Sequence, residues 1–138
     1  LRTDLSQKVD AVMELAEEIA SRAPLVIEEY RTKLNERIEQ LLGSVEVDRA
    51  RLATEVALFA DRASIDEEIV RLRSHVAQMR LLFEDSEPVG RRMDFVVQEM
   101  NREFNTIGSK ANDGELTGRV LLGKAEIEKI REQIQNIE

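Results

Sequence analysis

Apolar residues recur along this chain with the spacing of helices that pack against other helices. Between residues 5 and 23 the interval alternates between four and three, at Leu5, Val9, Val12, Ala16, Ile19 and Ala23. The same alternation returns at Ile65, Ile69, Leu72, Val76, Met79 and Phe83. This spacing places the side chains on one stripe of an α-helix and is typical of a coiled-coil or helical-hairpin seam. No segment shows the period of two that marks a half-buried strand. The pattern predicts an all-α chain.

The first predicted helix is long and contains a proline. After Pro24 the apolar stripe continues through Ile27, Tyr30, Leu34, Ile38 and Leu41. Proline lacks a backbone donor and crowds the preceding turn, so we expect either a kinked helix of about 40 residues or a break at residues 22–24. Gly43 and Ser44 end this helix, because glycine is common just past a helix C-terminus.

About four antiparallel helices are expected to follow. Asp48 can cap the second helix, and Ser64 followed by Glu67 is a capping-box pattern for the third. Pro88 suits the first turn of the fourth helix. The last helix would bury Leu116, Val120, Ile127, Ile130, Ile134 and Ile137.

The sequence therefore predicts a single helical domain over residues 1–138, a bundle with coiled-coil-like seams. Residues 1–43 would form a long helical arm, and residues 47–138 would carry the motifs. Long seams with few aromatic residues rarely bury themselves within one small chain. We expect the first helix to pack on the last helix or on another subunit, and the protein to be a homo-oligomer.

Composition narrows the class of protein. The chain has no cysteine, which favours an intracellular, cytoplasmic protein, and it has no apolar run of the ~20 residues that span a bilayer. It begins at Leu1, so we expect a fragment of a longer protein. The net charge of −8 is unfavourable for phosphate binding, although residues 71–92 hold five arginines. One tyrosine and no tryptophan argue against a stacking platform for unpaired bases.

Polar residues gather in the fourth predicted helix. Asp94, Gln98, Asn101 and Asn105 form a stripe beside its apolar face. Glu99 and Glu103 are four residues apart and could together hold Mg²⁺ or Mn²⁺, which prefer carboxylate oxygens. The alternative is a solvated face neutralised by Arg102.

Two further residues are candidates for chemistry. His75 lies beside the apolar stripe of the third helix and could be a general base, a metal ligand or a phosphate contact. A structural or interface histidine is the alternative. Glu55 lies close to the buried side of the second helix, where a carboxylate needs a partner. It could instead reach outwards or pair with Arg51. Glu68, by contrast, is explained by the helix dipole.

Three blocks of sequence, in this order along known proteins, are specific enough to indicate a family. The most specific runs Gly-Arg-Arg-Met-Asp-Phe at 90–95 and Gln-Glu-Met-Asn-Arg-Glu at 98–103, then Asn-Thr-Ile at 105–107 and Ser-Lys at 109–110. The middle block is residues 55–61, 66–68, 71–72 and 74–75. The last block is residues 131–138. Together the three blocks resemble the YicC/YloC family. Phe104 departs from the family pattern, because small residues are common at that position.

The resemblance implies a bacterial protein, often labelled stress-induced, that acts as a divalent-metal-dependent endoribonuclease. Members have an additional N-terminal region, assemble as ring-like hexamers and take RNA into a positively lined interior. This chain would be their C-terminal helical part, with the N-terminal region absent.

Combined with this resemblance, the residue patterns give a hypothesis for the site. Carboxylates would bind Mg²⁺ or Mn²⁺, which neutralises a phosphate oxygen and activates water or stabilises the leaving oxygen. The residues assigned to catalysis are Glu99, Glu103 and His75; to the metal, Glu55, Glu99 and Glu103; and to RNA binding, Arg71, Arg91, Arg102, Asn101, Asn105 and Lys110. The competing hypothesis is an oligomerisation, scaffold or RNA-binding module, with the activity in the N-terminal region.

Overall fold

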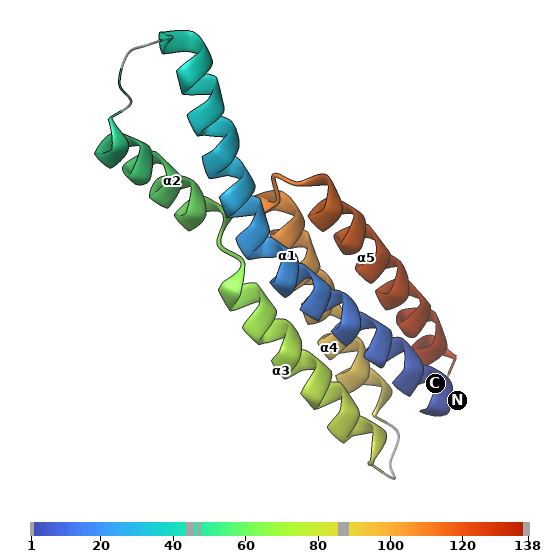
Figure 1. Cartoon of the computed structure of the whole chain (residues 1–138). Coiled ribbons are helices and arrows are strands. Elements are labelled where there is room, and N and C mark those ends of the chain that lie inside the picture. Colours follow the sequence, from blue (N-terminus) through green and yellow to red (C-terminus); the bar gives the residue numbers. More distant parts are fainter. Residues whose placement is uncertain (1, 44–45, 47, 86–88, 137–138) are drawn as a thin grey trace.

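The chain folds into helices that follow one another along the sequence. A computed structural model describes residues 2–43, 46, 48–85 and 89–136. The helices are α1 (Arg2–Leu42), α2 (Arg49–Ala63), α3 (Asp66–Phe83), α4 (Gly90–Lys110) and α5 (Gly114–Gln135) (Figure 1). The described residues contain no strand, so the all-α prediction is confirmed. Ser44, Pro88 and Ile137 lie outside the described residues.

The first half of α1 and the helices α3, α4 and α5 form a four-helix bundle (Figure 1). In this bundle α1 packs on α3 and α5, and α4 also packs on α3 and α5. The seam predicted between residues 5 and 23 is buried from Leu5 to Ile19, and the seam of α3 is buried from Ile69 to Met79. The first seam is therefore covered within this chain, largely by α3 and α5.

α1 continues without a break through Pro24, so a single helix of 41 residues replaces the predicted alternative of two. The helix changes direction near its middle (Figure 1). Pro24 has no N–H to give to the carbonyl of Ala20, and such a missing bond is a common cause of a bend. Beyond the bend, α1 pairs with α2 to form an arm that projects from the bundle. Tyr30 and Phe59 stack across this arm with ring centroids 3.9 Å apart.

The helix ends can be compared with the capping residues predicted from the sequence. The Asp48 side chain accepts hydrogen bonds from the backbone N–H groups of Ala50 and Arg51, as expected for an N-cap. Gly43 ends α1 in the left-handed region at φ 62°, which glycine adopts at little cost. The capping box at Ser64 was wrong, because α3 begins one residue later than that pattern requires and Ser64 ends α2 instead. The Ser64 carbonyl accepts a hydrogen bond from Lys110 Nζ at 3.0 Å.

α4 and α5 approach closely where Phe104 meets Gly123. Phe104 is fully buried, and a Cβ added at Gly123 would lie 2.6 Å from its ring. The ring of Phe104 therefore fits here only because Gly123 has no side chain. This contact presses α4 against α5, while Glu103, about 100° around α4 from Phe104, faces Arg71 on α3.

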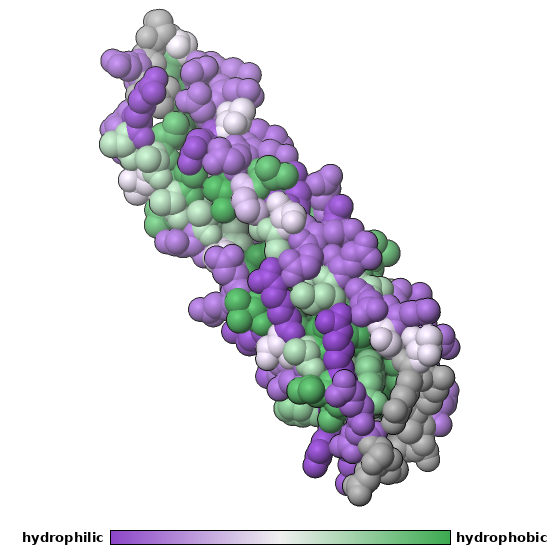
Figure 2. All heavy atoms as spheres, turned by 60° about the horizontal axis from the view of Figure 1, so that its bottom comes forward, coloured by the Kyte–Doolittle hydropathy of each residue, from purple (hydrophilic) through white to green (hydrophobic). Residues whose placement is uncertain are grey.

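Hydrophobic residues also reach the surface. Figure 2 shows one face of the elongated molecule, where they form patches separated by hydrophilic side chains. The exposed large residues of the bundle helices include Leu81, Phe95 and Leu121. None of the described helices has a stretch apolar enough to cross a lipid bilayer.

Candidate functional site

Two carboxylates are buried where α3 faces α4. Glu68 on α3 is 2% exposed and Glu103 on α4 is 3% exposed. A buried carboxylate is costly unless a cation and hydrogen bonds compensate it. Arg71 and Lys110 supply those cations, and both side chains keep part of their surface in solvent.

Arg71 binds Glu103 through its Nε alone. The Nε atom lies 2.8 Å from Glu103 Oε1 and 3.0 Å from Oε2, and this hydrogen bond raises the pKa of Arg71. The terminal nitrogens come no nearer than 3.7 Å to Glu67 and 3.9 Å to Glu68, too far for good hydrogen bonds. The side chain is 47% exposed. Arg71 thus offers its two terminal nitrogens to an anion at the α3–α4 interface while Nε stays fixed.

Lys110 secures the other buried carboxylate. Its Nζ lies 2.5 Å from Glu68 Oε1. Burial raises the pKa of Glu68, but the hydrogen bond from Lys110, a backbone hydrogen bond and the charges of Lys110 and Arg71 outweigh it, so the pKa is lowered. Glu68 therefore stays ionised near neutral pH. Its second oxygen, Oε2, is buried and has no hydrogen-bond partner among the described residues.

His75 lies next to this pair of carboxylates with one ring nitrogen unused. Its Nδ1 is 3.3 Å from Gln78 Oε1, and its Nε2 is 3.8 Å from Glu103 Oε2. With Gln78 Oε1 as the acceptor, Nδ1 carries the proton and Nε2 of the neutral ring carries the lone pair. Nε2 is buried without a hydrogen-bond partner among the described residues. In this tautomer the Nε2 lone pair of His75 is free to accept a proton.

Helical spacing explains why these side chains meet. Glu68, Arg71 and His75 are separated by three and four residues, so they share one stripe of α3. Glu103 and Lys110 are seven residues apart and share one stripe of α4. The two stripes face each other across antiparallel helices. We call the set Glu68, Arg71, His75, Glu103 and Lys110 the α3–α4 cluster.

Four members of this cluster were candidates from the sequence, whereas Glu68 and the neighbouring Gln78 were not. Glu68 had a sufficient local explanation in the first turn of α3, where an acid complements the helix dipole. Glu68 could have been found from the sequence, because it lies on the same helical stripe as Arg71 and His75.

The three carboxylates predicted to bind a metal are not brought together. Glu55 is exposed on α2, which belongs to the projecting arm. Glu99 lies one turn from Glu103 on the same side of α4, with Arg102 Nη1 3.8 Å from its Oε1. Among the described residues, no group of three or more His, Asp or Glu side chains is placed to hold a metal ion.

The predicted RNA-binding residues separate into two sets. Arg71 and Lys110 belong to the α3–α4 cluster, whereas Asn101 and Asn105 lie two residues on either side of Glu103. At 100° per residue they point about 160° away from it. Their stripe turns towards α5, as Asp94 shows by accepting from Gln98 and lying 3.9 Å from Arg131 Nε. The arginines Arg91 and Arg102 are exposed on α4.

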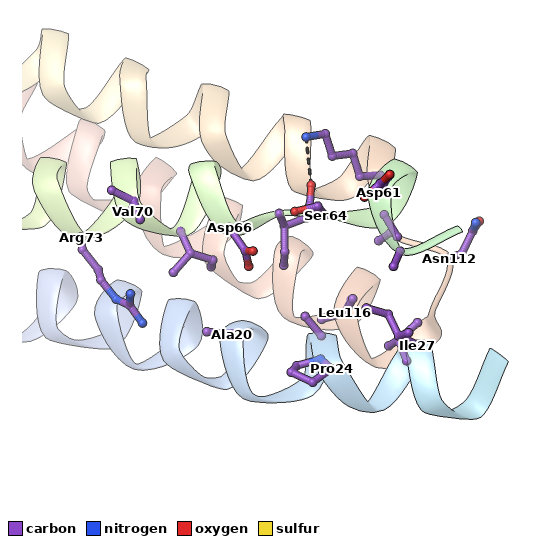
Figure 3. Close-up of a pocket in the computed structure, with 18 residues that line it drawn as sticks. Ala20, Pro24, Ile27, Asp61, Ser64, Asp66, Val70, Arg73, Asn112 and Leu116 are labelled. Atoms are coloured by element: carbon purple, nitrogen blue, oxygen red, sulfur yellow. Dashed lines mark hydrogen bonds between the residues drawn. The ribbon is translucent and has the colours of Figure 1, made fainter. Parts of the chain in front are cut away.

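A cavity of about 560 Å³ adjoins the Lys110 end of the cluster. It lies where the middle of α1, the end of α2, the start of α3 and the α4–α5 connection meet (Figure 3). Alanine and branched aliphatic residues form much of its wall, and Figure 3 draws the bond from Lys110 to the Ser64 carbonyl. Arg73 also lines it, but its guanidinium is bound to Glu17 at 2.7 and 2.9 Å. The cavity thus offers mainly apolar surface beside Lys110.

Fold and site together define a helical bundle with a charged acid–base cluster between two antiparallel helices. Comparison with known proteins shows that the chain belongs to the family described as endoribonuclease YicC-like, C-terminal, whose profile matches residues 19–138. This confirms the resemblance found in the sequence.

Two relatives carry the same description. The chain is 49% identical over 139 residues to the probable endoribonuclease YicC of Clostridioides difficile, covering 100% of this chain and 47% of the relative. It is 34% identical over 134 residues to the probable endoribonuclease YicC of Haemophilus influenzae, covering 97% of this chain and 46% of the relative. The chain therefore spans about half the length of these relatives.

Proposed function

We propose that the full-length protein containing this chain is an endoribonuclease and that the α3–α4 cluster takes part in RNA cleavage. The observation that carries the proposal is the buried Glu103, bonded to Arg71, beside the unused Nε2 of His75. Relatives named as probable endoribonucleases support the activity, and the cluster supplies residue types that phosphodiester cleavage needs.

Each member of the cluster has a distinct part in this proposal. RNA binding uncovers His75 Nε2, which takes the proton from the attacking oxygen as the phosphorus bond to the leaving oxygen breaks. The leaving oxygen takes a proton from solvent, and Glu103 stabilises the positive ring of His75. The terminal nitrogens of Arg71 and the ammonium group of Lys110 bind the phosphate and stabilise its developing charge. Both cations are held by buried carboxylates, so they are oriented before RNA arrives.

We also propose that the divalent ion implied by the family resemblance, Mg²⁺ or Mn²⁺, binds together with RNA. Mg²⁺ commonly uses one or two protein carboxylates plus substrate phosphates. Glu99 and Glu103, one turn apart, fit that requirement, whereas a cage of three carboxylates with Glu55 does not fit the geometry. The ion would supply charge neutralisation at the phosphate. Calorimetry with Mn²⁺ should show weak binding to the protein alone and tighter binding with a non-cleavable RNA analogue. Tight binding without RNA would contradict this.

The activity is tested by comparing Arg71→Ala with Arg73→Ala in the full-length protein. Both arginines lie on α3 and their side chains are about equally exposed, at 47% and 45%, but Arg73 binds the exposed Glu17 on α1 and lies outside the cluster. Cleavage of a labelled RNA with Mn²⁺ should fall by about 10²–10³ for Arg71→Ala and stay near wild type for Arg73→Ala. Equal rates for the two variants would refute the proposal.

A structural scaffold is the second candidate, and one observation favours it. The pairs Arg71–Glu103 and Lys110–Glu68 compensate both buried carboxylates and would staple α3 to α4 without any chemistry. If so, Glu103→Gln and Glu99→Gln should leave RNA cleavage intact, and Glu103→Gln should only lower the melting temperature. Loss of cleavage with an unchanged melting temperature favours the enzyme.

We further propose that the protein is a homo-oligomer joined through the arm. Leu41 and Leu42 are exposed at the end of α1 on this arm, and exposed apolar residues near one another can mark interaction sites. Leu41→Lys should lower the molar mass measured by light scattering. An unchanged mass would exclude the arm as the contact.

A further inference from the structure

An apolar groove lies at the end of the α3–α4 interface opposite Lys110. It is formed by the last turns of α3 and the first turns of α4, with Leu81 and Leu82 on one side and Phe95 on the other. The Phe95 side chain is 64% exposed. A phenyl group left so open to water on a packed helix is costly, because its burial would be favourable.

The groove and the α3–α4 cluster belong to the same face. Gln78, which bonds the His75 ring, also lines the groove. Phe95, Glu99 and Glu103 follow one another at intervals of four, so they lie on one side of α4. Eight residues at 1.5 Å each separate Phe95 from Glu103 by about 12 Å along the helix. A ligand lying along this face would reach both places.

The edge of the groove is positively charged. Arg91 and Arg92 line it one turn before Phe95. In the part of the chain that the structure describes, neither guanidinium has an ion-pair partner. Unpaired arginines are notable in a chain of net charge −8. In a symmetric contact between two copies of this groove, the arginines of one copy would lie beside those of the other. Repulsion between these like charges opposes a second copy of this chain as the occupant.

We propose that Phe95 stacks against an unpaired base of single-stranded RNA while Arg91 and Arg92 bind the neighbouring phosphates. The inference rests on the proposed function and places a second subsite on the same strand. A distance of about 12 Å corresponds to three or four nucleotides at a stacked rise of 3.4 Å. Aromatic side chains bind unpaired bases of any sequence in this way. The sequence argument against a stacking platform considered tyrosine and tryptophan, and composition does not show that the ring of Phe95 is exposed.

Phe95→Leu is the decisive variant, because leucine keeps an apolar side chain and removes the stacking ring. Phe95→Trp keeps the ring. Leu121→Ala is the matched control, since Leu121 is 63% exposed on α5, away from the groove. Single-turnover cleavage by full-length protein with Mn²⁺, at increasing protein concentration, gives the half-saturating concentration and the maximal rate separately.

With single-stranded RNA, Phe95→Leu should raise the half-saturating concentration by about 5- to 150-fold, the range for losing one stacked base. The maximal rate should stay within about twofold, while Phe95→Trp and Leu121→Ala resemble wild type. Saturation of Phe95→Leu at the wild-type concentration would overturn the inference and leave the proposed function standing. A lower molar mass for Phe95→Leu in light scattering would also overturn it, because the groove would then contact protein. If the wild type cleaves no RNA, the proposed function fails and the inference fails with it.

Discussion

The contact between Phe104 and Gly123 predicts opposite effects for two identical substitutions in α5. A Cβ at Gly123 would lie 2.6 Å from Cε1 and Cζ of Phe104 and 3.1 Å from Cδ1. Ordinary carbon–carbon contacts are about 3.5–4.0 Å, so the ring must move by about 1 Å. Phe104 is fully buried, so its ring can move only by displacing its neighbours in the core. A Cβ at Gly118, in the same helix, meets nothing within 4 Å.

Overpacking of this kind costs about 1–3 kcal/mol. Replacing glycine by alanine inside a helix gains up to about 1 kcal/mol. Since both variants gain that propensity, the difference between Gly118→Ala and Gly123→Ala isolates the overpacking term of about 1–3 kcal/mol. With an unfolding entropy of about 2.1 cal/mol/K per residue, this is a melting-temperature difference of roughly 3–10 °C.

Urea unfolding of the 138-residue chain, followed by helical circular dichroism, measures this difference. Gly118→Ala should be more stable than wild type and Gly123→Ala less stable. Phe104→Leu should partly rescue Gly123→Ala in a double-mutant cycle. Equal stability of the two alanine variants would show that the Phe104 ring does not fill this contact, and the packing argument for position 104 would be wrong.

Two other predictions concern the charged contacts. Lys110→Met leaves Glu68 buried without its cation and should lower the free energy of unfolding in urea at pH 7 by about 1–3 kcal/mol. Adding Glu68→Gln to this variant should recover part of that loss. Wild-type stability of Lys110→Met would contradict the pairing. The hydrogen bond from Arg22 lowers the pKa of Asp113 below its ordinary value of 3.8. A carboxylate with a lowered pKa in the folded state contributes stability that is present above its unfolded pKa and lost as the pH falls through its folded pKa. The free energy of unfolding should therefore decrease as the pH falls below about 4, and Arg22→Ala should weaken that dependence; an identical pH profile would contradict it.

Apolar spacing and capping residues were enough to predict the helices, because helix formation depends on residues that are close together in the sequence. The stripe from Leu5 to Ile19 is buried as predicted, and Asp48 caps α2. The predicted capping box at Ser64 and Glu67 was wrong because two helices meet there. Ser64 ends α2, and α3 begins at Asp66. Lys110, 46 positions further along the chain, bonds the Ser64 carbonyl, and no local pattern contains that information.

The site was less predictable because it depends on which helices become neighbours. Arg71, His75, Glu103 and Lys110 were each identified, but the bond between Arg71 and Glu103 requires α3 and α4 to be antiparallel partners. Glu55 was assigned to the metal because Leu52 and Phe59 place it near an apolar side. α2 packs on α1 in the arm, however, so that carboxylate stays exposed and distant from the bundle interface.

The central claim is that His75 transfers a proton during RNA cleavage. Its most direct test is single-turnover cleavage of labelled RNA by full-length His75→Gln with Mn²⁺, alongside RNA affinity and melting temperature. Glutamine resembles histidine in size and polarity but cannot act as a base at neutral pH. The maximal rate should fall by about 10²–10⁴, with affinity and melting temperature close to wild type. A maximal rate within twofold of wild type would contradict the account and leave the α3–α4 cluster as a structural staple.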